Sequence, residues 1–256
     1  MAIPFYKYQG TGNDFVLIDN RDLHFNKNNT DLVKLLCDRK FGIGADGLIL
    51  LEPDAEAHFK MVYYNADGRE SSMCGNGGRC IVHFARFLGI VEDEATFTAI
   101  DGWHEATIEG DIVSLKMTNV EGLTEKEDSI FLDTGSPHHV TQVEGLKDYN
   151  VFSEGRSIRN DVYGEAGANV NFVEPLAKNT FSVRTYERGV EDETLSCGTG
   201  VTAVAIAMHA WGKAGEAVTI ETPGGTLEVS FEKQNGHYEN IWLKGPAKQV
   251  FKGSWE

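Results

Sequence analysis

The sequence predicts an α+β protein with mostly antiparallel sheets, and three features of the chain point to this class. Short runs of alternating apolar and polar side chains outnumber helical patterns along the 256 residues. Glycine accounts for 28 of those residues, enough to supply the tight turns that join short strands. The regular strand–helix–strand rhythm that a parallel sheet requires is absent from the sequence.

The strands are predicted from alternating runs bounded by turn residues. In the first half of the chain they cover residues 5–9, 16–19, 48–52, 59–65, 106–109 and 113–117. In the second half they cover residues 130–133, 140–143, 169–174, 180–186, 218–222, 227–231 and 241–244. Gly110-Asp111 separates two of these runs and predicts a hairpin turn.

Helices are fewer. One is predicted from Thr30, as its cap, to about Lys40, and a short one covers residues 153–158. Two more follow Cys74 and Cys197, where apolar side chains recur at helical spacing. Those side chains are Ile81, Phe84 and Leu88 in the first helix, and Val201, Val204, Ala205 and Met208 in the second. Gly89 and Gly212 are expected to end them.

The two cysteine-led helices belong to a duplicated pattern. A strand, a polar turn, about eight residues, Cys-Gly-x-Gly and a helix occur once around Cys74 and again around Cys197. A cysteine at a helix N-terminus lies near unpaired N–H groups and the positive end of the dipole, which favours the thiolate. The glycines leave backbone N–H groups uncovered and ready to hold a carboxylate. Such a pair of thiols suits proton removal from one face of a carbon with delivery to the other.

The duplication predicts two halves, residues 1–118 with Cys74 and residues 119–245 with Cys197. The seam is expected in the polar stretch 118–127, where Gly122 interrupts the strands. We expect the two halves to face each other across a cleft, so that one cysteine from each lies beside a shared substrate.

Composition and charge exclude several classes of protein. The net charge of −16 and the pI of about 4.9 argue against a general nucleic-acid binder, which needs a basic surface, and indicate a well-hydrated one. No apolar run approaches the roughly 20 residues of a membrane helix, and no signal peptide is visible, so we expect a cytoplasmic protein.

The spacing of the four cysteines excludes other chemistry. It lacks the close C-x₂-C pairs of zinc sites and of thiol–disulfide redox proteins, so we expect no bound metal. A disulfide scaffold is not expected in a cytosolic chain of this size. Cys37 and Cys80 lie in helical apolar patterns and are expected in the core.

Weaker motifs leave alternatives open. Asn13, after the first strand, is either a turn residue or a ligand-binding one. The stretch from Gly42 to Gly47 lacks the strand-before, helix-after context of a dinucleotide loop, so a nucleotide role is rejected. His138, beside a turn proline, is a structural residue or an acid–base helper. Glu187-Arg188 is either a surface ion pair or a clamp in which the arginine grips a carboxylate.

Taken together, these residues resemble the diaminopimelate epimerase family. The matching segments, in family order, are residues 10–15, 42–47, 65–68, 74–77, 137–138, 169–172, 186–189 and 196–200. The resemblance implies a cofactor-independent epimerase that interconverts LL- and meso-diaminopimelate in lysine and cell-wall precursor synthesis, commonly as a homodimer. It also implies two pseudo-symmetric halves, each a sheet curled around a central helix, with a C-terminal strand at 246–256 returning to the first half.

The resemblance also implies roles for particular residues. Cys74 and Cys197 would be the acid and the base, with their protonation adjusted by His138 and Glu187 respectively. The N–H groups at Gly75-Asn76 and Gly198-Thr199 would hold the reacting carboxylate. At the distal end of the substrate, Arg188 would bind the carboxylate, Glu187 would accept from the ammonium, and Asn13, Asn65 and Asn169 would orient the centre. The chain departs from the family at Ser136, where an asparagine is common.

Three rival functions remain at this point. A racemase of the proline or hydroxyproline type would also use two cysteines, but its substrate needs no distal clamp such as Arg188. A non-catalytic amino-acid-binding relative would be expected to have lost one of the cysteines, and both are present. A redox protein would favour a C-x-x-C pair, which the sequence lacks.

Overall fold

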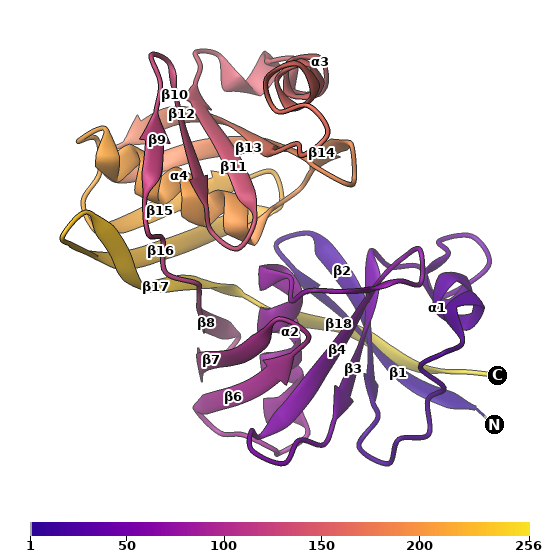
Figure 1. The fold of residues 1–256 in the computed structure, drawn as a ribbon. Coiled ribbons are helices and arrows are strands. Elements are labelled where there is room, and N and C mark those ends of the chain that lie inside the picture. The colour runs from indigo at the N-terminus through magenta and orange to yellow at the C-terminus, as the bar shows by residue number, and fades with distance from the viewer. Residues whose placement is uncertain (1) are drawn as a thin grey trace. The chain divides into compact units, whose positions relative to one another are not determined.

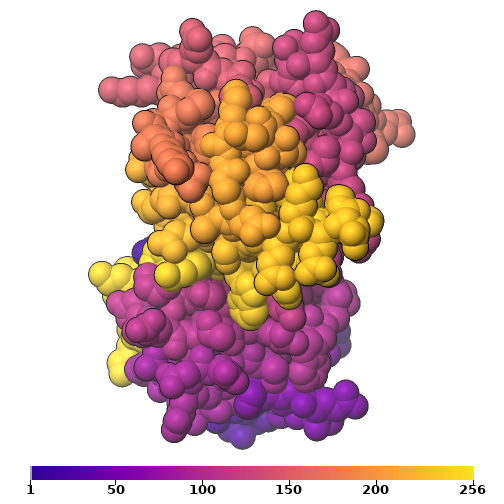
Figure 2. Space-filling view, turned by 90° about the vertical axis from the view of Figure 1, so that its left-hand side faces the viewer, coloured from indigo at the N-terminus to yellow at the C-terminus, as the bar shows by residue number. Residues whose placement is uncertain are grey.

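The computed structural model describes residues 2–256, which form two compact units (Figure 1). Unit 1 reaches to Leu115 and also contains Gly245–Glu256, and unit 2 is Lys116–Lys244. The end of the chain therefore belongs to the unit in which the chain begins, and Figure 2 shows yellow C-terminal residues among the magenta atoms of unit 1.

Unit 1 is a mixed sheet with two helices. Its strands pair in the order β18-β1-β2-β3-β4-β6-β7-β8, with β5 as a short addition to β4. All these pairings are antiparallel except β2–β3 and β4–β6. The elements are β1 (Ile3–Gly10), β2 (Asn13–Asp19), α1 (Thr30–Cys37), β3 (Gly47–Glu52), β4 (Phe59–Asn65), β5 (Glu70–Ser71), α2 (Gly75–Phe87), β6 (Glu94–Ala99), β7 (Gly102–Glu109), β8 (Ile112–Lys116) and β18 (Lys248–Trp255).

Unit 2 repeats this plan. Its strands pair in the order β9-β10-β11-β12-β13-β15-β16-β17, with β14 added to β13 and with β11–β12 and β13–β15 parallel. The elements are β9 (Leu123–Glu125), β10 (Ser129–Asp133), β11 (Pro137–Gln142), η1 (Leu146–Asp148), α3 (Val151–Ser157), η2 (Ile158–Val162), β12 (Asn169–Ala177), β13 (Thr180–Glu187), β14 (Asp192–Thr194), α4 (Gly198–Ala210), β15 (Ala217–Thr222), β16 (Gly225–Gln234) and β17 (His237–Pro246).

The two units are related strand for strand. Each has two parallel pairings at the same two places in the strand order, and each inserts its 13-residue helix, α2 or α4, between the short strand and the next long one. The outermost strand also corresponds, because β18 pairs with β1 as β9 pairs with β10. The duplication visible around the cysteines therefore extends to the whole fold.

Each sheet curls around its helix. Helix α2 packs against β1, β2, β3, β4, β7 and β18, and α4 packs against β10, β11, β12, β13, β15 and β16. Gly77 shows how closely α2 approaches its sheet, because a Cβ there would lie 3.1 Å from the Ile49 side chain and 3.5 Å from that of Phe15. Strand β3 is buried along its whole length, since α1 and α2 both pack on it, which explains its unbroken apolar sequence.

The predicted fold class is confirmed, and each predicted strand has its counterpart. Strand β6 was missed because only Ala95 and Phe97 turn inward, which leaves a weak apolar signal among polar neighbours. The short strands β5, β9 and β14 were also missed, and runs of two or three residues carry no period.

The prediction for the first helix was wrong at both ends. Asn29, not Thr30, is the N-cap, and its side chain accepts a hydrogen bond from Leu32 N at 3.1 Å. The helix ends at Cys37 rather than near Lys40, because the Asp38 carboxylate accepts hydrogen bonds from the N–H groups of Lys40 and Phe41 and turns the chain. Thr30 is the first helical residue.

This cap is testable. Asn29→Ala should lower the free energy of unfolding by about 1 kcal/mol in urea titrations, because one N–H group of the first turn loses its acceptor. The matched change Thr30→Ala should stay within about 0.5 kcal/mol of the parent protein. A larger loss from Thr30→Ala than from Asn29→Ala would show that the cap is assigned to the wrong residue.

Candidate active site

Both predicted cysteines stand at the N-cap of a buried helix. Cys74 precedes α2 with φ −95° and ψ 130°, and Cys197 precedes α4 with φ −119° and ψ 111°, so each residue is extended before its helix starts. Their carbonyls accept the first helical bonds, from Gly78 N at 2.7 Å and from Val201 N at 2.9 Å. Each cysteine therefore lies at the positive end of a helix dipole.

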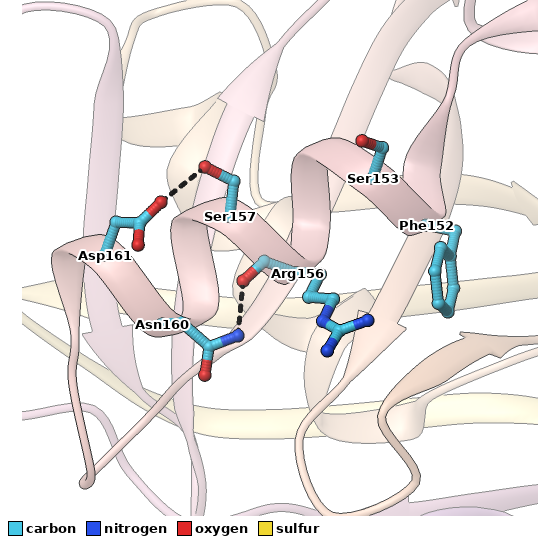
Figure 3. A pocket seen from close by; sticks show the side chains of 6 residues that line it. All are labelled: Phe152, Ser153, Arg156, Ser157, Asn160 and Asp161. Carbon is cyan, nitrogen blue, oxygen red and sulfur yellow. Dashed lines mark hydrogen bonds between the residues drawn. The ribbon is translucent and has the colours of Figure 1, made fainter.

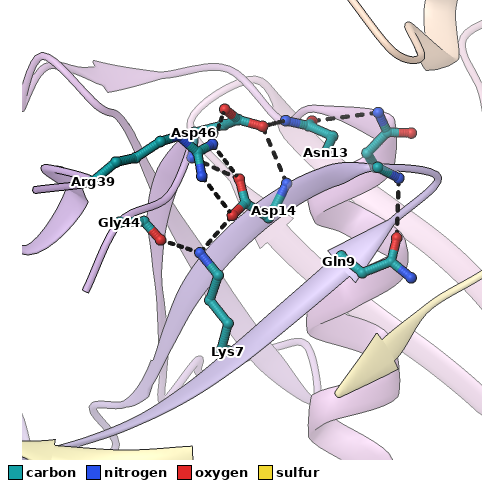
Figure 4. Close-up of polar contacts among 9 residues, drawn as sticks. Lys7, Gln9, Asn13, Asp14, Arg39, Gly44 and Asp46 are labelled. Atoms are coloured by element: carbon teal, nitrogen blue, oxygen red, sulfur yellow. Dashed lines mark hydrogen bonds and ion pairs between the residues drawn. The ribbon is translucent and has the colours of Figure 1, made fainter. Parts of the chain in front are cut away.

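In unit 1, the amide of Asn13 faces Cys74. Its Oδ1 lies 3.6 Å from the Cys74 Sγ and accepts a bond of 3.3 Å from Asn76 Nδ2. Its Nδ2 donates to Asp46 Oδ2 at 2.6 Å (Figure 4). Since the carboxylate can only accept, the amide is held with its oxygen toward the cysteine.

A network of ion pairs holds Asp46 in turn (Figure 4). Arg39 Nη2 lies 2.7 Å from a carboxylate oxygen of Asp46 and 2.7 Å from one of Asp14, and the buried Lys7 pairs with Asp14 at 2.6 Å. Burial alone would raise the pKa of Asp14, but the bonds from Arg39 and Lys7 outweigh it and lower the pKa to about 2. Asp14 is therefore ionised at neutral pH, and the network fixes the Asn13 turn.

Asn65 lies beside the same network. It ends β4 opposite Gly47, and the N–H of the following Ala66 donates to the Asp46 carbonyl at 3.1 Å. The residue is exposed, so its side chain is accessible to a ligand. Unit 1 thus brings together Cys74, Gly75, Asn76 and Asn13, with Asn65 on an adjoining turn.

In unit 2, Cys197 lies beside Thr199. The Cys197 Sγ is 3.4 Å from the Thr199 hydroxyl, and the Thr199 carbonyl accepts from Thr134 Oγ1 at 2.9 Å. Gly200 permits strand β12 to approach, because a Cβ there would lie 2.5 Å from the Asn171 Oδ1. The Cys-Gly-x-Gly sequence therefore serves close packing as well as an open helix start.

Asn169 is hydrogen-bonded to three other residues of unit 2, of which Arg188 is a predicted site residue. Its Nδ2 donates to Ser136 Oγ at 3.0 Å and to the Pro137 carbonyl at 3.3 Å, and its Oδ1 accepts from Arg188 N at 2.9 Å. Ser136, where the family often has asparagine, thus supports the Asn169 amide. The Arg188 guanidinium is exposed and donates one bond, of 2.9 Å, to the Ala166 carbonyl. Glu187 ends β13 immediately before it.

His138 is fully buried and uncharged at neutral pH. Burial, together with the charge of Arg188, lowers its pKa from 6.5 to about 3. Its Nδ1 lies 3.2 Å from Asn171 Nδ2, and that amide is oriented by a bond to the His139 carbonyl and by one from the Thr185 hydroxyl. Nε2 also lies 3.5 Å from an amide nitrogen, Asn169 Nδ2, but the two hydrogens of that amide go to Ser136 Oγ and to the Pro137 carbonyl. Nδ1 is therefore the acceptor, and the imidazole hydrogen is assigned to Nε2.

Three residues near the site were not predicted: Arg79, Asp46 and Asn171. Asp46 and Asn171 lie inside matching segments, 42–47 and 169–172, and Arg79 lies two residues beyond the segment 74–77, but no functional role was predicted for any of the three. Asn171 follows Asn169 at the spacing of one strand face, which could have indicated a second inward amide.

Other features of the described residues contribute no chemistry to this site. A shallow pocket on α3 and η2 is lined by Phe152, Ser153, Arg156, Ser157, Asn160 and Asp161, none of them a predicted site residue (Figure 3). Within residues 2–256, no group of three or more His, Cys, Asp or Glu side chains is placed to hold a metal ion. None of the helices described there is long and apolar enough to cross a membrane.

Comparison with solved structures defines the class of fold. A PhzF-family phenazine biosynthesis protein from Bacillus anthracis matches all of this chain and 99% of its own with a TM-score of 0.78 at 13% identity. A hydroxyproline epimerase from Agrobacterium vitis matches 99% of this chain and 92% of its own with a TM-score of 0.73 at 14% identity. The chain therefore has the two-unit fold that these proteins share.

Sequence comparison identifies the family within that class. The sequence profile described as diaminopimelate epimerase matches residues 5–121 and 130–250. A diaminopimelate epimerase from Flavobacterium psychrophilum is 60% identical over 252 residues, covering 97% of this chain and 98% of the relative. The chain belongs to the diaminopimelate epimerase family, as its motifs predicted, and is an isomerase of lysine biosynthesis.

The state of His138 gives a prediction for solution. The unfolded chain binds a proton on this residue near pH 6.5, whereas the folded protein binds it only near pH 3. Its contribution to stability is therefore complete above pH 6.5 and is lost as the pH falls from there toward 3. Nitrogen NMR of labelled histidines should show His138 neutral, with hydrogen on Nε2, at about pH 5. A charged His138 signal at that pH in folded protein would contradict the assignment.

Proposed function

We propose that this chain epimerises diaminopimelate with Cys74 and Cys197 as a paired acid and base, without an organic cofactor or a metal. The observation that carries the proposal is the matched placement of the two residues, each at the N-cap of a buried helix that opens with Gly-x-Gly. Family membership supplies the substrate, an amino acid with a second amino-acid group at its distal end.

The reaction needs proton transfer at a carbon of low acidity. In one direction, the thiolate of one cysteine removes the α-proton, and the thiol of the other donates its proton to the opposite face of the same carbon. The two sulfurs have then exchanged protonation states, and the reverse reaction runs from that point. Proton count and charge are balanced with no further reactant.

The intermediate carbanion places negative charge on the reacting carboxylate. The first N–H groups of a helix have no intrahelical partner and lie at the positive end of its dipole. We assign those of Gly75-Asn76 and Gly198-Thr199 to that carboxylate. Removal of a single such donor in other enzymes costs about 3–4 kcal/mol of transition-state stabilisation, so two helix starts supply an effect of useful size.

The distal end of the substrate is assigned to the polar side chains of both units. The Arg188 guanidinium is exposed and donates one hydrogen bond, to the Ala166 carbonyl, so its fork can bind a carboxylate. The Asn169 side chain accepts a hydrogen bond from the Arg188 N–H. The Asn13 side chain donates to the Asp46 carboxylate, and Asn65 precedes Ala66, whose N–H donates to the Asp46 carbonyl. Glu187 is proposed both to accept from the distal ammonium and to adjust Cys197.

His138 is proposed to act as a neutral group. Its pKa of about 3 means that it cannot supply a positive charge to a thiolate at neutral pH, but its Nε2–H can donate a hydrogen bond. We therefore propose that His138 adjusts the protonation of Cys74 as a neutral, buried hydrogen-bond donor.

A racemase that acts on proline or hydroxyproline is the second candidate, because a hydroxyproline epimerase shares the fold. Such a substrate has no distal amino-acid group for Arg188 to bind. The homodimer that the family resemblance implies and the cytoplasmic location that the sequence predicts complete the proposal. Sedimentation at micromolar concentration tests the first, and fractionation of the source cell tests the second.

The cysteine pair is tested by substitution. Cys74→Ser and Cys197→Ser should each lower kcat for LL-diaminopimelate by at least about a thousandfold, because a serine hydroxyl is far less acidic than a thiol. The assay uses purified protein with EDTA and no added cofactor. Cys37→Ser changes a buried cysteine of α1 and should keep most activity if it folds. Near-normal turnover by either catalytic variant would refute the two-thiol mechanism.

The distal clamp is tested at Arg188. Arg188→Lys keeps the charge but loses the two-point geometry, so kcat/KM for diaminopimelate should fall about tenfold to a hundredfold. Part of the loss should appear in kcat, because remote binding energy helps to position the reacting carbon. Arg156→Lys, on α3, is the control. Unchanged kinetics in the Arg188 variant would make it a surface charge and reopen the choice of substrate.

A further inference from the structure

Arg79 is a fully buried arginine in the second turn of α2, with 0% of its surface exposed. Its guanidinium donates to Asn76 Oδ1 at 2.9 Å, to Thr11 Oγ1 at 3.0 Å and to the Gly75 carbonyl at 3.4 Å, and its Nε lies 3.5 Å from the Pro246 carbonyl. All four acceptors are neutral. The side chain is therefore well hydrogen-bonded, but its charge is not balanced by these contacts.

Among residues 2–256, the structure gives Arg79 no carboxylate partner. A buried charge is strongly disfavoured unless it is paired, and burial lowers the pKa of Arg79 to about 10, which still leaves it protonated at neutral pH. The titratable groups that interact with it are two cysteines of the same segment, Cys80 and Cys74. These two thiols are the candidates for its counter-charge.

Cys80 is unsuited to that role. It is fully buried, and burial raises the pKa of its thiol to about 12 despite the neighbouring Arg79. It remains a neutral thiol at neutral pH. Cys74, at the N-cap of α2, is only partly buried and lies at the positive end of the helix. Of the two thiols, Cys74 is the one that can ionise.

We infer that Arg79 is a positioning residue that supplies the buried counter-charge for the Cys74 thiolate and so sets the ionisation of Cys74 apart from that of Cys197. This inference rests on the proposed function and deepens it. Arg79 does not touch substrate, because its side chain is fully buried and its hydrogen bonds go to protein oxygens. Its positive charge, buried in the second turn of α2, stabilises the thiolate electrostatically. Arg79 also binds the oxygen of the Asn76 amide, whose nitrogen is thereby directed toward Asn13.

The related position in unit 2 supports this difference. Thr202 stands five residues after Cys197, as Arg79 stands five after Cys74, and it is equally buried. Its hydroxyl donates to the Gly198 carbonyl at 3.0 Å, the counterpart of the Gly75 carbonyl that Arg79 contacts. Unit 2 thus keeps the hydrogen bond without the charge. The two helices match in length and in their cysteine cap, but only α2 has a charged side chain five residues after that cysteine.

One contact acts in the opposite direction. The Asn13 oxygen faces the Cys74 Sγ at 3.6 Å, and an acceptor beside the sulfur favours the thiol. This contact is long, its acceptor is an uncharged amide oxygen, and Asn13 is partly exposed to solvent. The full charge of Arg79 lies in a dry environment, where electrostatic interactions are stronger, so we expect it to outweigh the amide.

The test follows the alkylation of each cysteine by iodoacetamide between about pH 5 and 10, with peptide mass spectrometry to locate the label. In the parent protein, the pH at which alkylation reaches half of its maximum rate (the midpoint) should be lower for Cys74 than for Cys197. Arg79→Met should raise the Cys74 midpoint by about one unit, which makes alkylation near neutral pH about tenfold slower, and should leave the Cys197 profile in place. Arg79→Lys should restore part of the shift.

The control is Arg86→Met, which removes a positive charge from the last turn of the same helix and should move neither profile. An unchanged Cys74 profile in folded Arg79→Met would overturn the inference, as would equal shifts of both cysteines. Should Arg79→Met fail to fold, the parent protein decides, because a Cys197 midpoint below that of Cys74 contradicts the inference. Alkylation needs no turnover, so this result is independent of whether Cys74→Ser and Cys197→Ser abolish epimerisation.

Discussion

A whole helix is enclosed by a curled sheet in each unit of this protein, and the chemistry follows from where those helices begin. The first four N–H groups of any helix lack helical partners, and a buried helix start cannot leave them to bulk water. In both units the residue at that point is a cysteine followed by glycines, in place of the serine, threonine or aspartate that usually caps a helix. The same constraint thus provides an anion site and a thiol next to it.

The rest of each unit holds the groups around that helix start. In unit 1 the chain of contacts runs from Lys7 and Asp14 through Arg39 and Asp46 to Asn13, so paired charges end on an amide beside the sulfur. In unit 2 the equivalent support is made mostly of neutral groups, with amides at Asn169 and Asn171 around an uncharged His138. Duplication preserved the backbone, while the electrostatic surroundings of the two thiols diverged.

The sequence was sufficient for the fold class and for most elements, because strand periods and the repeated Cys-Gly-x-Gly are local signals. It failed where tertiary contacts decide. The cap at Asn29 and the end of α1 depend on which side chain reaches the backbone, and β6 carries too few apolar residues to show a period. The neutral state of His138 and the burial of Arg79 depend on residues distant in sequence, so no local pattern could indicate them.

The most direct measurement of the two-base mechanism is the fate of hydrogen when LL-diaminopimelate is epimerised in deuterated water. One thiol removes the substrate proton and the other, already exchanged with solvent, delivers a deuteron to the opposite face. Early in the reaction, the product should carry one deuterium at the inverted carbon, and recovered substrate should carry almost none. Recovered substrate that gains deuterium as fast as product forms would contradict the mechanism, because a single group would then be removing and returning the hydrogen.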